Sequence, residues 1–279
     1  MDQRFTPMDV PCHVELRGRF AGPAFSLWHR ELVRFFRQRN RVASAVATPI
    51  LLWIMLGTGL DSMVHWQPAP DAIEVGYRVY FFPGTLSMIL LFTAIFSTIT
   101  VIEDRQAGLL QGVLAAPVAR SAIVMGKVLG GATIALAHGV LFLLLWPLTI
   151  AWPGTGAMAW TLTAAVGISS VMAIGLTAMG LAIAWRMRST AGFHAVMMLF
   201  LMPMWFLSGA VFPLNEAPAW MQWIMWCNPM AYGQAALAAV LCGGTGTPLS
   251  LAPTLIAALL ISAALVATAI GIVGQREKA

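Results

Sequence analysis

Six long apolar stretches, separated by short polar connections, constrain this sequence more than any other feature. They lie at residues 42–60, 79–102, 128–150, 158–185, 191–212 and 251–273. A helix needs about 20 predominantly apolar residues to cross about 30 Å of hydrocarbon, and each stretch reaches or approaches that length. The fourth is over-long, which indicates a tilted helix or ends that lie inside these bounds. The pattern predicts an all-α polytopic membrane protein with six transmembrane helices.

The composition agrees with a membrane protein. Hydrophobic residues make up 59% of the chain and charged residues only 10%, whereas a soluble domain has about 25% charged residues. Six spans with short loops use up the 279 residues, so we expect a transmembrane domain at 42–273 and no soluble catalytic domain. The net charge of +5 could suggest nucleic acid, but the placement of the charges argues against that partner.

The residues before the first span predict a cytoplasmic N-terminal segment, 1–41, that ends in an interfacial helix. Residues 1–22 show no apolar core between a positive start and a small-residue cleavage site, so we expect no cleaved signal peptide. At 24–41, apolar residues recur at helical spacing and arginines occupy much of the remainder, which is typical of an amphipathic helix in the membrane surface. The positions that carry this prediction are Trp28, Arg30, Arg34 and Arg37.

A charged segment, Glu103 to Lys127, separates the second and third spans. It holds five charged residues, each of which would cost roughly 2.5–3.5 kcal/mol in hydrocarbon, so we expect a water-exposed turn. Residues 107–116 are predicted to form a short helix that ends at Pro117. Its apolar face would hold Leu109, Leu110, Val113 and Leu114. Such a helix, held by two spans, offers a soluble partner a surface to push.

The distribution of Lys and Arg predicts the orientation. If the N-terminus is cytoplasmic, every Lys and Arg except Arg78 falls on the inner side. By the positive-inside rule, both termini, the tail at 274–279 and the 103–127 turn then face the cytoplasm of a bacterial inner membrane.

Two short helices are predicted on the outer side, between the fifth and sixth spans. Residues 213–228 are too short for a full span, and Trp220, Trp223 and Trp226 recur every three residues. This pattern suits a re-entrant or interfacial helix. Pro229 would begin a second short helix over 230–241. One interpretation is an aromatic belt, and the other is a lid over the exit of a transport path.

These segments together resemble the six-span permease subunit of type-2 ATP-binding-cassette exporters, the group of drug, nodulation-factor and surface-polysaccharide exporters. Three parts of the chain, in the family's order, carry the resemblance: the helix Phe25–Arg41, the inner turn and the outer segment. In the inner turn the matching residues are Glu103, Asp104, Arg105, Gly108, Leu109, Leu110, Pro117 and Arg120. In the outer segment they are Ser208, Gly209, Phe212, Pro213, Trp220, Asn228, Pro229 and Tyr232.

The resemblance implies a mechanism and a set of partners. The inner turn would contain the coupling helix that docks on a cytoplasmic ATPase, and the outer segment would act as a gate. Two ATPase subunits, which bind ATP and magnesium, would drive a pair of permeases, identical or related. The chain also departs from the family pattern. Ala235 and Ala238 stand where an acidic residue and an arginine are common, with Gln234 adjacent, and Gln111 replaces a second acidic residue.

The chain itself shows no motif for ATP chemistry. Residues 121–128 contain a Gly-Lys pair but lack both the earlier glycine and the following Ser or Thr of a phosphate-binding loop. The three cysteines fit no metal spacing, although Cys227 and Cys242 could pair on an oxidising outer side. We therefore expect a permease without an active site, a cofactor or a metal.

Candidate path residues come from the spans. An ionisable residue in a membrane is a candidate for the transport path, which selects His138 and, with less weight, His194. Methionines and aromatics of the fifth span could form an adaptable apolar wall, represented by Met202 and Trp205. Gly126 and Gly130 form a small-residue pair that permits close helix packing, either within the chain or against a partner.

The predicted function is ATP-driven export of an amphiphilic or hydrophobic substrate: a drug, a lipid or a lipid-linked glycan. A structural or assembly protein without transport activity is one alternative. An intramembrane serine protease is another, but Ser208 and His194 would be separated by about 21 Å along one helix, and no nucleophile motif surrounds Ser208.

Overall fold

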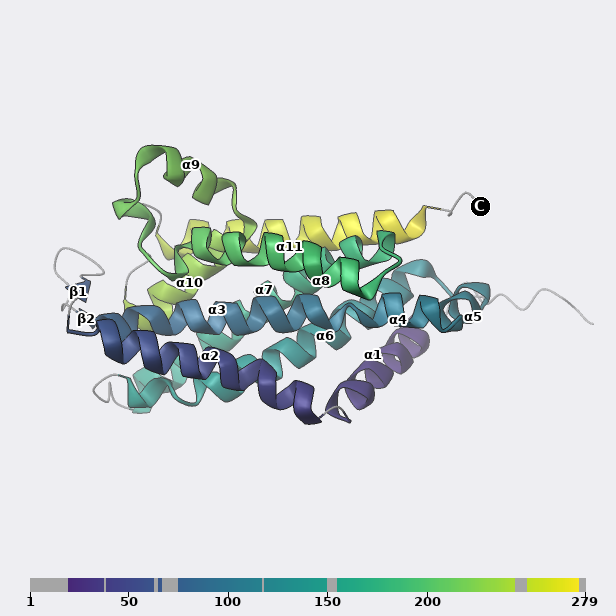
Figure 1. Cartoon of the computed structure of the whole chain (residues 1–279), viewed down its shortest axis with the longest axis horizontal. Coiled ribbons are helices and arrows are strands. Elements are labelled where there is room, and N and C mark those ends of the chain that lie inside the picture. The colour runs from purple at the N-terminus through teal and green to yellow at the C-terminus, as the bar shows by residue number, and fades with distance from the viewer. Residues whose placement is uncertain are drawn as a thin grey trace, which may run out of the picture.

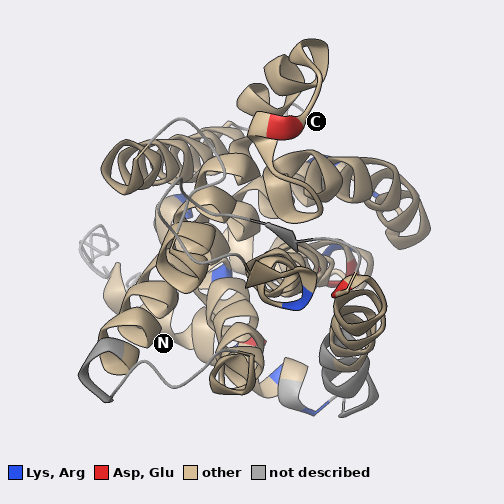
Figure 2. Cartoon of the chain, turned by 90° about the vertical axis from the view of Figure 1, so that its left-hand side faces the viewer, with Lys and Arg blue, Asp and Glu red and all other residues tan. Residues whose placement is uncertain are grey.

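The computed structural model describes residues 20–37, 39–62, 65–66, 75–116, 118–149, 155–243 and 250–275. In this part of the chain nearly all regular structure is helical, and the long helices run along the molecule's longest axis (Figure 1). Seen end on, most helices point towards the viewer and most of the ribbon is uncharged (Figure 2). The exception to the all-α prediction is a two-stranded antiparallel ribbon that pairs β1 (His65–Trp66) with β2 (Val75–Gly76).

The first two helices meet at a corner. The expected interfacial helix at 24–41 is instead α1 (Ala21–Phe36), and α2 (Arg39–Leu60) begins before the span expected at 42. The prediction was wrong here because the two helices pack on different neighbours: α1 crosses α6, whereas α2 lies along α3. The periodicity that predicted one helix over 24–41 therefore includes most of α1 and the start of α2, two helices that run in different directions.

Helix α3 (Tyr77–Ser97) forms the centre of the bundle. It contacts α2, α6, α7 and α10, and almost all of its residues are buried. Phe82 stacks on Phe142 of α6 with ring centroids 4.5 Å apart, and Trp53 of α2 packs edge-on against both rings. A helix that is apolar on all sides belongs inside a bundle, which explains the central position of α3.

The charged elbow is formed by three elements. It consists of α4 (Thr100–Gln106), α5 (Leu109–Ala115) and the start of α6 (Arg120–Leu143). Gly108 separates α4 from α5 with φ +73°, a left-handed conformation that favours glycine. The predicted short helix is therefore present but begins two residues later than expected. Pro117, expected to end it, lies outside the described residues.

The remaining helices complete the bundle and its end opposite the elbow. After α6 come η2 (Trp146–Leu148), α7 (Thr155–Arg186) and α8 (Thr190–Trp205), which continues into a π-helical turn, η3 (Phe206–Ala210). The outer segment contains η4 (Leu214–Glu216), α9 (Ala219–Cys227) and α10 (Pro229–Cys242). The last helix is α11 (Leu251–Gly274). In Figure 1, α9 projects sideways from the bundle, at the end opposite α5.

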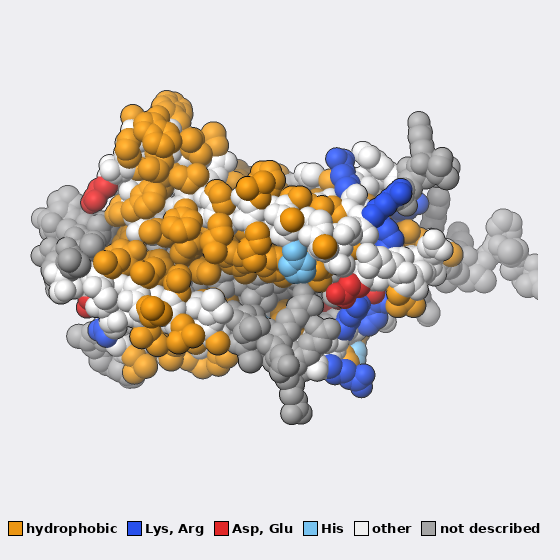
Figure 3. Space-filling model, viewed as in Figure 1, with side chains coloured by type: hydrophobic (Ala, Val, Ile, Leu, Met, Phe, Trp, Pro, Cys, Tyr) orange, Lys and Arg blue, Asp and Glu red, His pale blue; other side chains and the backbone are white. Residues whose placement is uncertain are grey.

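Among the described residues, five helical segments are long and apolar enough to cross a membrane. They are Tyr77–Gln106, Arg120–Leu148, Met158–Arg186, Thr190–Ala210 and Leu251–Gly274. The stretch expected at 42–60 falls on α2, which is not one of these five. Within α2, Ala47–Leu60 is apolar but shorter than the five segments. Figure 3 shows a broad apolar belt along the molecule, with most Lys and Arg gathered at the end that carries α1, α4 and α5.

Candidate functional site

Helix α1 lies against α6 because two glycines leave room for it. A Cβ atom at Gly126 would lie 2.8 Å from the carbonyl oxygen of Ala24, and one at Gly130 would lie 2.9 Å from Cβ of Glu31. The indole of Trp28 also donates to Thr133 Oγ1 at 3.1 Å. The small-residue pair noted in the sequence therefore packs within this chain, against its own N-terminal helix.

A network of ion pairs joins α1, α4 and α6 at this contact. Asp104 is its centre: Oδ2 accepts from Arg30 at 2.6 Å and from Lys127 at 3.0 Å, and Oδ1 accepts from Arg34 at 2.9 Å. Lys127 also binds Glu31 at 2.8 Å. Arg34 further pairs with Glu103. Three helices that are distant in the sequence are thereby connected through one carboxylate.

Two charged residues of the predicted water-exposed turn are buried instead, while much of the rest of the turn is exposed. Asp104 is 2% exposed and Lys127 is 6% exposed. Buried charges are tolerated when they are paired and hydrogen-bonded, and here each one faces opposite charges. Arg30 and Arg34 of the predicted interfacial helix pair with carboxylates of the chain itself. Arg37, at the end of α1, is exposed.

Two further arginines of the elbow cap the ends of other helices. Arg105 donates to the carbonyl oxygens of Trp185 at 2.6 Å and Met187 at 2.7 Å, and its guanidinium lies 5.7 Å from the Trp185 ring centroid. Arg120 donates to carbonyls at the end of α11, including Val273 at 3.1 Å. The last carbonyls of a helix lack partners within it and favour cations. Both arginines thus tie the elbow to the rest of the bundle.

Helix α5 keeps a free surface between these anchors. Leu110 is buried at 3% exposure, whereas Leu109 is 56% exposed, and Gln111 and Gly112 beside it are also exposed. The four leucine and valine positions predicted to share one face are therefore divided, with Leu109 pointing away from the chain. An exposed leucine on a short helix with fixed ends is a suitable contact for a second protein.

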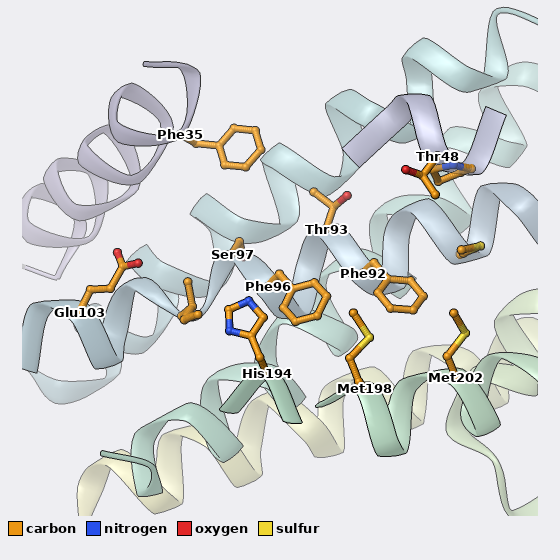
Figure 4. A pocket seen from close by; sticks show the side chains of 13 residues that line it. Phe35, Thr48, Phe92, Thr93, Phe96, Ser97, Glu103, His194, Met198 and Met202 are labelled. Carbon is orange, nitrogen blue, oxygen red and sulfur yellow. The ribbon is translucent and has the colours of Figure 1, made fainter. Parts of the chain in front are cut away.

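A cavity of about 480 Å³ opens beside α3, between α2 and α8 (Figure 4). Most of its lining is apolar, with rings and thioethers from α3 and α8 facing each other across it. The described lining residues are Phe35, Thr48, Pro49, Met88, Phe92, Thr93, Phe96, Ser97, Ile99, Glu103, His194, Met198 and Met202. Glu103 places the cavity next to the ion network, at the end that carries the elbow.

The predicted path residues lie in different places. Met202 lines this cavity and so does His194, whose ring stacks on Phe96 with centroids 5.2 Å apart. Trp205 does not line it: the ring is buried and its Nε1 donates to the Gly84 carbonyl at 2.9 Å. His138 is also buried outside it: Nδ1 bonds to Ile134 O, and Nε2 finds no partner in the part of the chain that the structure describes.

The outer segment is held to the bundle by side chains of the Asn-Pro-x-x-Tyr motif. Asn228 accepts from the Met230 amide at 3.0 Å and donates to Met204 O at 2.6 Å, and Tyr232 donates to Trp226 O at 2.9 Å. Pro229 occupies the first turn of α10, a position that suits proline. The motif thus has a structural role at the corner between α9 and α10. Phe212 and Pro213 precede this corner, and Trp220 on α9 is exposed.

Two tyrosines that the sequence analysis missed hold the π-helical turn after α8. Tyr80 donates to Gly209 O at 2.9 Å, and Tyr77 donates to Val211 O at 3.2 Å. Gly209 has φ +86°, and the backbone of Ala210 passes so close to α3 that a Cβ atom at Gly84 would lie 2.3 Å from Ala210 O. The sequence signal that could have identified them is their position just before Pro83, a proline inside an apolar span.

Helix α10 carries a buried polar side chain, Gln234, next to Ala235. Gln234 is buried and, with its amide oriented to match its neighbours, donates to Ser87 Oγ at 2.8 Å and Pro83 O at 3.0 Å. Pro83 has no N–H, so the carbonyl of Val79 lacks its helical partner and instead accepts from Cys242 Sγ at 3.3 Å. Cys227 and Cys242 are both free, so the disulfide considered from the sequence is absent.

The serine–histidine pair of the protease alternative is not formed among the described residues. Ser208 Oγ donates to Trp205 O at 2.7 Å, and His194 Nδ1 bonds to Thr190 O at 2.9 Å within its own helix. A serine nucleophile requires a base within hydrogen-bond reach. Each of the two side chains instead bonds to a backbone carbonyl three or four residues earlier in the chain.

Taken together, long apolar helices, a charged elbow at one end and a lateral cavity define a multi-pass membrane protein of the transport-permease class. The chain belongs to the ABC-2 type transporter family, whose model matches residues 24–242. It is similar to ycf38 of Cyanophora paradoxa, named as a transport permease, with 27% identity over 219 residues, which cover 76% of this chain and 72% of ycf38. It is also 25% identical to YbhR of Escherichia coli K12, named as a multidrug ABC transporter permease, over 70% of this chain and 54% of YbhR. The chain thus matches about half the length of YbhR.

Proposed function

We propose that this chain is the permease subunit of an ATP-driven exporter and that α5 is the surface on which an ATPase subunit acts. The observation that carries the proposal is the exposed Leu109, on a short helix whose flanks are anchored to the bundle. Asp104 fixes the elbow to α1 and α6, while Arg105 and Arg120 fix it to α7 and α11. A push on α5 would therefore move several helices together, as rigid-body transitions require.

The membrane arrangement that accompanies this function has six spans, with α2 as the first. Its apolar part, residues 42–60 after Arg41, extends about 28 Å at 1.5 Å per residue, which is close to the roughly 30 Å of hydrocarbon in a bilayer. The gathering of Lys and Arg around α1, α4 and α5 supports a cytoplasmic location for this end (Figure 3). Both termini would then face the cytoplasm of a bacterial inner membrane, and α9 and α10 would lie at the outer surface.

The ATP chemistry in this proposal belongs to the partner. Two cytoplasmic ATPase subunits bind ATP and magnesium, and a second permease copy, identical or related, completes the transporter. Because coupling acts through the elbow, the contact needs an apolar surface on α5 rather than a nucleotide site in this chain.

The lateral cavity is the candidate substrate path. Its volume of about 480 Å³ falls in the range of about 300–1,000 Å³ that is typical of small-molecule sites, which favours an amphiphilic or hydrophobic molecule of drug size over a lipid-linked glycan. Methionine and phenylalanine side chains on α3 and α8 offer an adaptable apolar surface. YbhR is named as a multidrug ABC transporter permease, which points to the same class of substrate.

Leu109→Asp tests the proposal. The variant and the wild type are purified with the ATPase subunit and reconstituted in liposomes, and ATP hydrolysis and transport of a fluorescent amphiphile are measured. We expect a loss of transport of at least about tenfold, because a buried charge at the contact costs several kcal/mol, with the thermal midpoint of the permease unchanged.

Phe20→Asp is the matched control. It places the same charge on another exposed apolar position outside the elbow, and we expect wild-type transport. Normal transport by Leu109→Asp would show that α5 is not the coupling surface. A structural or assembly protein would show no ATP-dependent transport in any of the three preparations.

A further inference from the structure

The hydroxyl of Thr93 differs from every other serine and threonine hydroxyl between the start of α3 and the end of α4. Five others donate to a carbonyl three or four residues earlier in the chain, which is the usual arrangement for Ser and Thr inside helices. They are Thr85, Ser87, Ser97, Thr98 and Thr100, with distances of 2.6–3.1 Å. Thr93 is 6% exposed, and its Oγ1 meets no hydrogen-bond partner among the described residues.

Thr93, which carries this hydroxyl, lines the lateral cavity, and its oxygen is buried just behind the cavity surface. Figure 4 shows Thr93 on α3, near Phe92, Phe96 and Ser97, with Met198 and Met202 of α8 on the facing side. A buried hydroxyl without a partner is costly. An unpaired hydroxyl in a cavity wall is therefore a group that a bound molecule can satisfy.

The rest of the lining limits the chemical class of that molecule. No Lys or Arg is found among the described lining residues, and the ionisable ones are Glu103 and His194. An anion would meet no Lys or Arg among these described residues, whereas an aromatic or aliphatic body would contact Phe92, Phe96 and the methionine thioethers. A neutral molecule with one hydrogen-bond acceptor, such as a carbonyl or ether oxygen, fits this lining.

We propose that Thr93 is a substrate-binding residue whose hydroxyl donates to an acceptor oxygen on a neutral, mainly apolar molecule held in the cavity. This inference rests on the proposed function, because it takes the cavity as the transport path. It assigns to one side chain the choice between a plain hydrocarbon and a molecule of the same shape that carries an acceptor.

Binding is measured by competition for photolabelling in the full-length chain. Benzophenone is cross-linked to the protein in nanodiscs, and mass spectrometry quantifies labelling of the cavity methionines, Met198 and Met202. Fluorenone and fluorene then compete: the two molecules have nearly the same shape, but only fluorenone has a carbonyl oxygen. In wild type we expect fluorenone to compete at a concentration about 3- to 10-fold lower than fluorene, the ratio expected for one neutral hydrogen bond.

Thr93→Val keeps the shape of the side chain and removes the hydroxyl. We expect the two competitors to become equal in this variant, with the thermal midpoint unchanged or slightly raised because an unpaired buried group is lost. Thr93→Ser restores the preference for fluorenone. Ser97→Ala is the matched control: Ser97 lines the same cavity, but its hydroxyl donates to Ala94 O, so the preference should remain.

The outcomes separate this inference from the proposed function. Equal competition in wild type, or an unchanged preference in Thr93→Val, would overturn the role of Thr93 and leave the cavity as the path. If neither fluorenone nor fluorene reduced labelling of Met198 and Met202, both the role of Thr93 and the cavity as the substrate path would be overturned. Transport that depends on Leu109 would still support the exporter function in each case.

Discussion

Substitution of Asp104 by asparagine is the most direct test of the ion network as the joint between α1, α4 and α6. The change keeps the size of the side chain but removes the charge that Arg30, Arg34 and Lys127 share at 2.6–3.0 Å. Loss of one member of a buried ion pair costs about 3–5 kcal/mol. Arg30 and Arg34 are 38% and 34% exposed, and solvent weakens such contacts, so we expect about 3 kcal/mol.

This free energy is measurable as a shift in thermal unfolding. For a chain of this size, 1 kcal/mol corresponds to roughly 2–4 °C, so the midpoint should fall by about 6–12 °C. The assay is the loss of the monodisperse peak in size-exclusion chromatography after heating, with wild type and variant purified in the same detergent. Glu103→Gln is the control, because Glu103 is 34% exposed and, among the described residues, pairs with Arg34 alone. It should lower the midpoint by no more than about 2–4 °C.

A double variant tests whether the groups act together. Lys127→Met alone should also be destabilising, since it leaves Glu31 and Asp104 buried with fewer cations. Combined with Asp104→Asn, it should cost less than the sum of the two single changes, because the two residues interact directly. If Asp104→Asn lowers the midpoint no more than Glu103→Gln, the network contributes little to stability, and the view of the elbow as a rigid lever loses its support.

Two further predictions concern the contact between α3 and the turn after α8, and the contact between the elbow and the end of α7. Gly84→Ala should prevent α3 from packing on the turn after α8, because the new Cβ atom would lie 2.3 Å from Ala210 O; the yield of folded protein in size-exclusion chromatography should collapse. Gly167→Ala, where nothing lies within 4 Å, should be neutral or stabilising by about 0.5–1 kcal/mol, and equal behaviour of both variants would refute the packing argument. Arg105→Gln should release the end of α7 and speed tryptic cleavage after Arg186 and Arg188 about tenfold, since two charge-assisted hydrogen bonds are lost. Gln106→Ala, which removes a single exposed bond to Arg188 O, should change the rate by no more than about twofold, and similar rates for both variants would contradict the capping role of Arg105.

Much of the fold was readable from the apolar pattern alone. The second to sixth expected spans correspond to the five long apolar helices, because a stretch of about 20 apolar residues has few alternatives to a helix in lipid. Pro229 correctly predicted the start of a helix, since proline suits the first turn. The change of direction between α1 and α2 was missed, because helical periodicity carries no information about the direction in which consecutive helices pack.

The candidate site was less accessible to sequence reasoning. The charged residues of the elbow were identified, but they were expected in water. Their partners lie about 70 to 100 positions away in the chain, as the pairs Arg34–Glu103 and Lys127–Glu31 show. His138 and Trp205 were selected for the path by residue type, yet only their packing determines that they lie outside the cavity. Thr93 had no sequence signal at all, because a threonine in an apolar helix usually bonds to its own backbone.

The sequence by itself thus determined the class of protein, the approximate spans and the end of the molecule where charge gathers. These properties follow from the local cost of placing polar groups in hydrocarbon, and each can be judged within a window of about 20 residues. Only the tertiary structure decided that Asp104 and Lys127 are buried, that Leu109 rather than Leu110 is free, and that a cavity opens between α2 and α8. These outcomes depend on contacts between helices far apart in the chain, which no local pattern specifies.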